Sequence, residues 1–99
     1  MTSNLLEISS SAVISATQAQ ISSELPGEAV ILNLDAGIYY GLNEVGARIW
    51  ELITQRSRSF ADLHSSIMAE YEVSSEVCKQ DLVEVLLALR DAGLVKVDG

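Results

Sequence analysis

Residues 34–50, LDAGIYYGLNEVGARIW, decide the fold because they join a tight turn, an aromatic strand and a helix start. LDAG (34–37) fits a type I turn closed by Gly37 in the left-handed region, which predicts a three-residue hairpin loop with a bulge. IYYGL (38–42) is typical of a strand, and Asn43 is a favourable cap for the helix that follows it. The stretch therefore predicts a hairpin whose second strand runs directly into a helix.

The predicted turn sets which residues of the two strands pair, because a three-residue loop places Leu34 opposite Ile38. One face then carries large apolar residues or Tyr and is expected to be buried: Val30, Leu32, Leu34, Ile38, Tyr40 and Leu42. The other face carries smaller or more polar residues: Ala29, Ile31, Asn33, Tyr39 and Gly41. A slip of one residue would exchange these faces, so the register is a sharp prediction.

A second turn extends the sheet toward the N-terminus. LPGE (25–28) has Pro and Gly at the two central positions that a type II turn favours. Carrying the pairing back through this turn places Ile21 opposite Leu32. Residues 18–42 therefore predict a three-stranded antiparallel sheet with one buried face.

Three segments after residue 43 have the apolar periodicity of helices. The first has the stripe Val45, Ile49, Leu52 and Ile53, with Trp50 as a partly buried packing residue. The second starts at Ser59 with Asp62 in its first turn, and its stripe is Phe60, Leu63, Ile67 and Tyr71. The third is capped by Ser74 or Ser75 and runs to about Ala92, with Gly93 following its end.

The third helix has a wider apolar arc than one core contact requires, so we expect it to contact a partner as well. Its centre is Cys78, Leu82, Val85, Leu86 and Leu89. One flank carries Val77, Asp81, Ala88 and Ala92, and the other carries Val83 and Leu87. The sequence leaves open which flank serves a peptide and which a second protein.

The ends of the chain lie outside this sheet-and-helix core. Residues 1–17 are expected to form an N-terminal arm that is partly ordered or contains a short strand, and residues 18–97 a single domain. LVKV (94–97) predicts a short final strand. The chain lacks a signal peptide pattern and any run of about 20 apolar residues, so a cytoplasmic protein that does not enter a membrane is expected.

Composition excludes several classes of function. The net charge of −8 disfavours nucleic-acid binding, which requires clustered Lys and Arg. One cysteine, Cys78, and one histidine, His64, are too few for a disulfide or a structural zinc site. Cys78 lies within an apolar helix arc and His64 on a polar face, so both favour structural roles over nucleophilic catalysis. We expect no catalytic residues, no metal and no cofactor.

The strand at residues 38–42 would be an edge strand, and it has neither Pro nor a charged residue. Pro and charge are two common protections against edge-to-edge pairing, so this edge is open to a partner strand. The alternative is that the chain itself covers it, with either the N-terminal arm or LVKV (94–97).

Two motifs together resemble the PqqD-like superfamily, the recognition elements that bind leader segments of ribosomally synthesised and post-translationally modified peptides (RiPPs). They are LDAGIYYGLNEVGARIWELI (34–53) and DLVEVLLALRDAGLV (81–95), and the resemblance extends over about residues 18–97. The matching positions are Gly37, Tyr39 or Tyr40, Leu42, Asn43, Gly46, Ile49, Trp50, Asp81, Leu86, Leu89, Gly93 and Leu94. Val85 departs from the family pattern, which often has Phe at that position.

The resemblance implies an α+β, winged-helix-like fold with a three-stranded antiparallel sheet followed by three helices. It also implies a non-catalytic adaptor, most similar to the stand-alone leader-binding proteins of lasso-peptide pathways. The implied partners are the precursor leader, a separate cysteine leader peptidase and an asparagine-synthetase-like macrocyclase. The implied site combines the strand edge Ile38, Tyr39, Tyr40, Gly41 and Leu42 with the helix wall Val77, Cys78, Asp81, Leu82 and Val85.

Three other functions remain as alternatives. One is a PqqD-type peptide chaperone in a cofactor pathway or in another RiPP pathway. Another is a scaffold subunit that never contacts the precursor. The third is a winged-helix DNA-binding regulator, whose third helix would place Lys79 and Arg90 among four acidic residues, Glu76, Asp81, Glu84 and Asp91. Repulsion from the phosphates disfavours this last reading.

Overall fold

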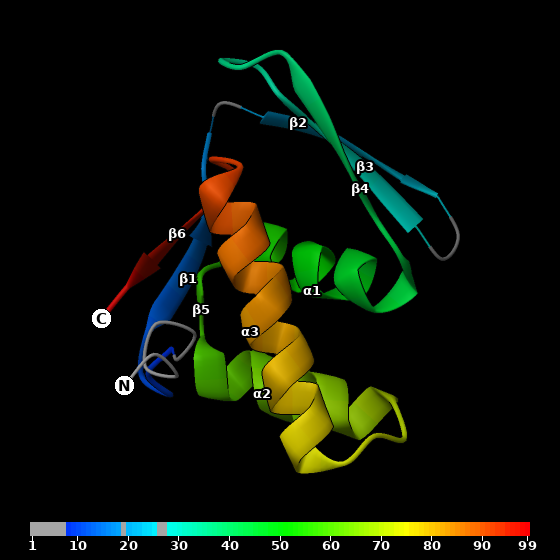
Figure 1. Ribbon diagram of the computed structural model, residues 1–99, viewed down its shortest axis with the longest axis vertical. Coiled ribbons are helices and arrows are strands. Elements are labelled where there is room, and N and C mark those ends of the chain that lie inside the picture. The colour runs from blue at the N-terminus through cyan, green and yellow to red at the C-terminus, as the bar shows by residue number, and fades with distance from the viewer. Residues whose placement is uncertain (1–7, 19, 26–27) are drawn as a thin grey trace.

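The computed structural model describes residues 8–18, 20–25 and 28–99 and contains three helices and two small sheets (Figure 1). This architecture confirms the predicted α+β class, with a second sheet that was not predicted. The strands are β1 (Val13–Ala16), β2 (Gln20–Leu25), β3 (Glu28–Asn33), β4 (Ile38–Leu42), β5 (Arg58–Ser59) and β6 (Val95–Asp98). The helices are α1 (Glu44–Gln55), α2 (Phe60–Glu70) and α3 (Ser75–Asp91).

The larger sheet has the antiparallel order β2-β3-β4, as predicted. Ile21 pairs with Leu32, which confirms the register of β2 against β3. The predicted LPGE turn includes residues 26 and 27, which lie outside the described residues.

The predicted register between β3 and β4 is wrong by one residue. Ile38 pairs with Asn33 instead of Leu34, and Tyr40 pairs with Ile31 instead of Leu32. The loop therefore contains four residues, 34–37, instead of three, although Gly37 has the expected positive φ of 70°.

The side chain of Asn33 explains the longer loop. Its Oδ1 accepts hydrogen bonds from the backbone nitrogens of Asp35 at 2.9 Å and Ala36 at 3.1 Å. The Asn33 carbonyl oxygen accepts a further bond from the Gly37 nitrogen at 2.8 Å. Asn side chains that bond to the backbone two residues later start turns in this way. The strand consequently ends at Asn33, and Leu34 belongs to the loop.

The corrected register exchanges the two faces of β3. Ala29 and Ile31 are buried beneath the sheet, whereas Leu34 and Ile38, which were predicted to be buried, are exposed. Val30 and Leu32 share the outer face with Tyr39, since Leu32 pairs with Tyr39 and Val30 with Gly41. On β4, Tyr40 and Leu42 pack against the core and Tyr39 lies on the outer face, as predicted.

Tyr40 packs against the core, and Tyr39 is 70% exposed. The two adjacent tyrosines of β4 therefore point to opposite faces of the sheet, as alternation along a strand requires.

The three helices begin where their capping residues predict. Asn43, Ser59 and Ser74 accept hydrogen bonds from the backbone nitrogens of Gly46, Asp62 and Val77, respectively. Gly93 follows α3 with a φ of 75°, the left-handed conformation expected after a helix end. Their buried residues form one core with Ile31 of β3: Ile49, Trp50, Leu52, Ile53, Phe60, Leu63, Ile67, Cys78, Leu82, Val83, Leu86 and Leu89. Trp50 is fully buried instead of partly buried.

The smaller sheet has the antiparallel order β5-β1-β6 and joins the two ends of the described chain. It confirms a short strand in the N-terminal segment and another near LVKV, and Ala12 and Ile14 contribute to the core. Because β1 and β6 pair with each other, neither lies on β4. The alternative that the chain covers the β4 edge is therefore wrong for LVKV and for the β1 part of the N-terminal arm, whose residues 1–7 lie outside the described residues.

The register can be tested by the stabilities of Ile31→Ala and Leu32→Ala. Ile31 is fully buried and Leu32 half-buried on the outer face, so Ile31→Ala should lower the free energy of unfolding by about 2–5 kcal/mol and Leu32→Ala by clearly less. Urea unfolding followed by circular dichroism measures both values. A larger loss for Leu32→Ala would contradict the observed register.

Candidate functional site

The outer edge of β4 is open along its length among the residues that the structure describes. In the described ranges β4 pairs only with β3, and it contains neither Pro nor a charged side chain. Ile38 and Tyr39 are 63% and 70% exposed, and a Cβ added at Gly41 would meet no atom within 4 Å. The unpaired backbone groups of such an edge can accept a further strand.

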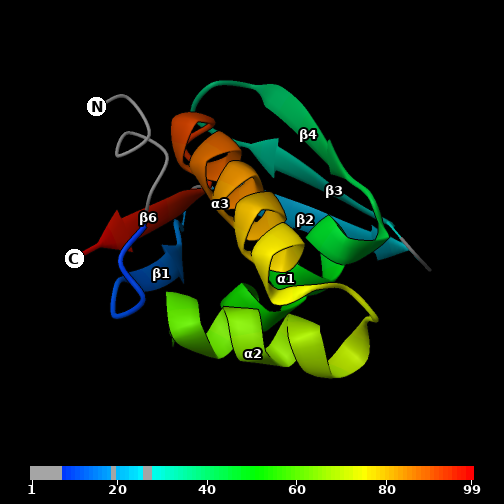
Figure 2. The ribbon, with the colours of Figure 1, turned by 60° about the horizontal axis from the view of Figure 1, so that its bottom comes forward.

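The β3–β4 hairpin is tied to the C-terminal end of α3 through Asn33, the last residue of β3. The Asn33 side-chain nitrogen donates a hydrogen bond of 2.7 Å to the carbonyl oxygen of Ala92. Figures 1 and 2 both place the loop before β4 beside this end of α3, and the first turn of α1 at the other end of β4. The hydrogen bond thus fixes the position of the open edge relative to α3.

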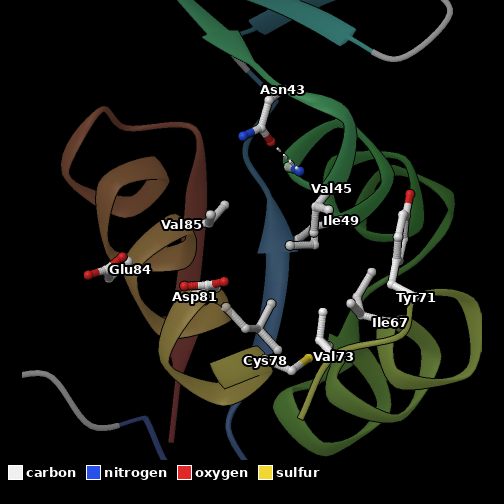
Figure 3. A pocket seen from close by; sticks show the side chains of 12 residues that line it. Asn43, Val45, Ile49, Ile67, Tyr71, Val73, Cys78, Asp81, Glu84 and Val85 are labelled. Atoms are coloured by element: carbon white, nitrogen blue, oxygen red, sulfur yellow. Dashed lines mark hydrogen bonds between the residues drawn. The ribbon is translucent and has the colours of Figure 1, made fainter. Parts of the chain in front are cut away.

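A pocket of about 330 Å³ lies where β4 passes into α1 (Figure 3). Its lining residues come from the first turns of α1, from the end of α2 and the segment after it, and from α3. They are Asn43, Val45, Gly46, Ile49, Ile67, Tyr71, Val73, Cys78, Asp81, Leu82, Glu84 and Val85. Most of these side chains are apolar.

The pocket adjoins the end of the open edge. Asn43 follows Leu42, the last residue of β4, and its Oδ1 accepts a hydrogen bond of 3.1 Å from the Gly46 nitrogen. A Cβ added at Gly46 would lie 3.1 Å from Cδ2 of Leu42, so the absence of a side chain there lets the end of β4 pack closely on α1. The pocket therefore begins one residue beyond the last residue of the open edge.

The structure brings together four of the five predicted helix-wall residues. Cys78, Asp81, Leu82 and Val85 line the pocket, whereas Val77 is exposed and does not. The five predicted strand-edge residues lie on β4 and lead toward the pocket without lining it.

Sequence reasoning missed the walls that α1 and α2 contribute to the pocket. Val45, Ile49 and Ile67 were assigned to the core because their helical spacing is that of a core stripe. The chain carried no separate signal that part of this stripe faces a cavity. The residues of the wall that were not predicted as site residues are Asn43, Val45, Gly46, Ile49, Ile67, Tyr71, Val73 and Glu84.

The other flank of α3 is less accessible to a partner. Val83 is buried in the core, and Leu87 packs against the core while half-buried. Val77 and Asp81 on the first flank are both exposed. Contact between the flank of Val83 and Leu87 and a second protein stays a prediction.

Cys78 and His64 do not form a nucleophile–base pair in the described part of the chain. Cys78 is buried, and burial, followed by the nearby Asp81 carboxylate, raises the pKa of its thiol. The His64 ring stacks on Phe60 with centroids 6.4 Å apart, and its Nε2 lies 3.2 Å from the Ser75 carbonyl oxygen. The surroundings of both residues therefore favour a role in packing for Cys78 and for His64.

Arg48 of α1 is held by two carboxylates. It binds Glu70 through Nη2 at 2.8 Å, which joins α1 to α2, and it binds Glu51 of its own helix through Nη1 at 2.9 Å. The hydrogen bonds from Arg48 lower the pKa of the Glu70 carboxyl. This pair remains exposed, so it orients the two helices more than it stabilises the fold.

Two other features are absent from the described ranges. No group of three or more His, Cys, Asp or Glu residues there is placed to hold a metal ion. None of the described helices has the length and apolarity that crossing a membrane requires.

Comparisons with known proteins place these features in context. The family model described as coenzyme PQQ synthesis protein D (PqqD) matches residues 28–95. The solved structure of TbiB1 in complex with the TbiA(beta) leader peptide is 33% identical with a TM-score of 0.77, covering 83% of this chain and 94% of that chain. Lasso peptide synthetase B1 complexed with the leader peptide has a TM-score of 0.72 over 84% of this chain and 96% of that chain; at 22% identity it supports the fold alone. A search of curated proteins gave no significant match.

The raised pKa of Cys78 can be checked by its reactivity. Because the thiolate is the reactive form and a raised pKa keeps the thiol protonated at pH 7, alkylation by iodoacetamide should be slower than for free cysteine. The rate should increase only at pH values above the pKa of free cysteine, where the Cys78 thiol begins to lose its proton. Asp81→Asn should increase the rate slightly, since burial contributes more to the shift than Asp81 does. Rapid alkylation at pH 7 in the folded protein would contradict this assignment.

Proposed function

This chain belongs to the PqqD family, and from that premise we propose that it binds the leader segment of a ribosomally synthesised precursor peptide in lasso-peptide biosynthesis. The observation that carries the proposal is the open edge of β4, which ends at an apolar pocket beside α3. The 33% identity to TbiB1, which was solved in complex with the TbiA(beta) leader peptide, supports leader binding. The choice of a lasso-peptide pathway over a cofactor pathway rests on the resemblance of residues 34–53 and 81–95 to the recognition proteins of lasso-peptide pathways.

In the proposed mechanism the leader adds a fourth strand to the β2-β3-β4 sheet along Ile38–Leu42. Backbone hydrogen bonds to the edge orient the leader without reading its sequence, and side-chain pockets supply the specificity. Tyr40 supports the edge from beneath because it packs against the core, while Gly41 leaves the outer face open.

The helix wall of the proposed site is the exposed flank of α3. Asp81 and Val85 lie one turn apart on this helix, and both line the pocket. The hydrogen bond from Asn33 to Ala92 fixes this wall relative to the strand edge, so the leader meets a site that is formed before binding. A preformed site of this kind reduces the ordering that binding requires.

The proposed role is that of a non-catalytic adaptor in the cytoplasm. Having bound the leader, the protein would present the precursor to a separate cysteine leader peptidase and to an asparagine-synthetase-like macrocyclase. Cys78 is buried with a raised pKa, and the His64 ring stacks on Phe60. Both observations are consistent with catalysis by those partners. The exposed acidic residues of α3 are consistent with a peptide ligand and unfavourable for DNA.

The direct test is a titration with a fluorescent synthetic leader from the precursor gene that neighbours the gene for this chain. Fluorescence anisotropy should show saturable binding with a Kd below about 100 μM, the range expected of a specific peptide interaction. A scrambled peptide of the same composition is the control. No saturable binding would overturn the proposal, and tight, salt-sensitive binding to duplex DNA would favour a regulator.

Strand addition can be tested at Gly41 with a matched pair of variants. Gly41→Pro removes a backbone donor from β4 and should weaken leader binding by about tenfold or more. Gly41→Ala is the control because an added Cβ meets no atom within 4 Å, and it should change the affinity by less than about twofold. The measurement is the same titration.

The comparison applies only while both variants keep the wild-type circular dichroism spectrum. Equal affinities of folded Gly41→Pro and Gly41→Ala would argue that the leader binds away from this edge.

A further inference from the structure

The pocket beside α3 points to the chemistry of one leader residue. We propose that it takes the side chain of a lysine or arginine, with the aliphatic stem in the apolar pocket and the cationic head at Asp81. This inference rests on the proposed function, because it assigns a ligand side chain to the same site. It goes further by naming the class of residue that the leader must carry next to the segment on β4.

The apolar part of the pocket suits an aliphatic stem. Its walls include Val45 and Ile49 of α1, Ile67 of α2, and Leu82 and Val85 of α3. Lysine and arginine place their methylene groups against such surfaces and keep the charged group at the rim. The volume of about 330 Å³ accommodates one long side chain without requiring the core to open.

The rim of the pocket carries negative charge that the described residues do not neutralise. Asp81 points into the pocket in Figure 3, and Glu84 lies on the outer side of the same helix. Neither forms an ion pair with any described residue. No Lys or Arg lines the pocket, and the nearby Arg48 is held by Glu51 and Glu70. A cation would therefore meet unpaired carboxylates.

Two ionisable groups in the pocket wall have pKa values raised first by burial and then by neighbouring carboxylates. The pKa of Cys78 is raised by burial and by Asp81, and the pKa of Tyr71 is raised by burial, then by Glu44 and Glu70, with Arg48 opposing. In both cases neighbouring carboxylates disfavour a further negative charge. The same field would favour a positive one.

A purely apolar leader residue fits this pocket less well. Seating it would remove water from the Asp81 carboxylate and leave that charge without a partner, which is costly. A cationic head provides the partner as the stem displaces the water. The positive end of the α1 dipole also lies near the pocket, but Asn43 caps it and Glu44 is an acidic residue in its first turn.

The position of the pocket determines which part of the leader reaches it. The pocket starts at Asn43, immediately after the last residue of the β4 edge. A strand paired with Ile38–Leu42 therefore leads past the mouth of the pocket at this end. The basic residue should be adjacent to the paired segment instead of distributed along the leader.

A double-mutant cycle between leader and protein tests the inference. Each lysine or arginine of the synthetic leader is replaced singly by norleucine, which keeps an aliphatic stem and removes the charge. Each peptide is titrated against the wild-type protein, Asp81→Asn and the control Glu76→Gln, an exposed acidic residue of α3 that does not line the pocket. The titrations are run at low and at high salt.

One replacement should weaken binding to the wild type and to Glu76→Gln by about fivefold, but to Asp81→Asn by less than about twofold. The loss should shrink at high salt, as expected for a charge pair at the rim. Leader binding without any position coupled to Asp81, or by a leader with no Lys or Arg, would overturn this inference and leave the proposed function standing. Failure of the unmodified leader to bind would overturn both.

Discussion

The side chain of Asn33 is the interaction on which the site geometry depends. Its oxygen accepts two backbone hydrogen bonds within the 34–37 loop, and its nitrogen donates to the Ala92 carbonyl at the end of α3. The first two bonds end β3 and set the register of β4, while the third joins the hairpin to the helix. One amide group thus determines both which face of the hairpin is buried and where its open edge lies.

The buried face of the hairpin follows from that constraint. With β3 ending at Asn33, Ala29 and Ile31 face the core beside Tyr40 and Leu42. Tyr39 and Leu32 are left on the outer face, together with Ile21. These inward side chains attach the sheet to the helical core, and the backbone edge of β4 takes no part in that packing.

The site combines two features that serve different aspects of recognition. A strand edge offers the same backbone groups to any extended peptide, so it orients a ligand and does not select one. The pocket beyond Asn43 adds an apolar wall with Asp81 at its rim, and these groups can discriminate between side chains. Their contiguity allows one extended segment to use both.

The sequence by itself determined the order of the three strands β2-β3-β4 and the three helices, the three helix caps, the left-handed Gly37 and Gly93, and the opposite directions of Tyr39 and Tyr40. These follow from local rules of capping, glycine conformation and strand alternation, which operate within a few residues. The unprotected edge at 38–42 and most of the α3 wall were equally visible, because they depend on residue type and helical spacing.

Only the tertiary structure decided the register of β4 against β3, the pocket and the burial of Val83. The pairing of Ile31 with Tyr40 follows the bonds of Asn33 to its own loop, and the same side chain is held in place by Ala92, a residue 59 positions away. The periodicity of Val45 and Ile49 shows a stripe but cannot say that part of it borders a cavity left between α1 and α3. Val83 is buried because α3 packs into the common core, and the sequence cannot state which neighbours cover a wide apolar arc.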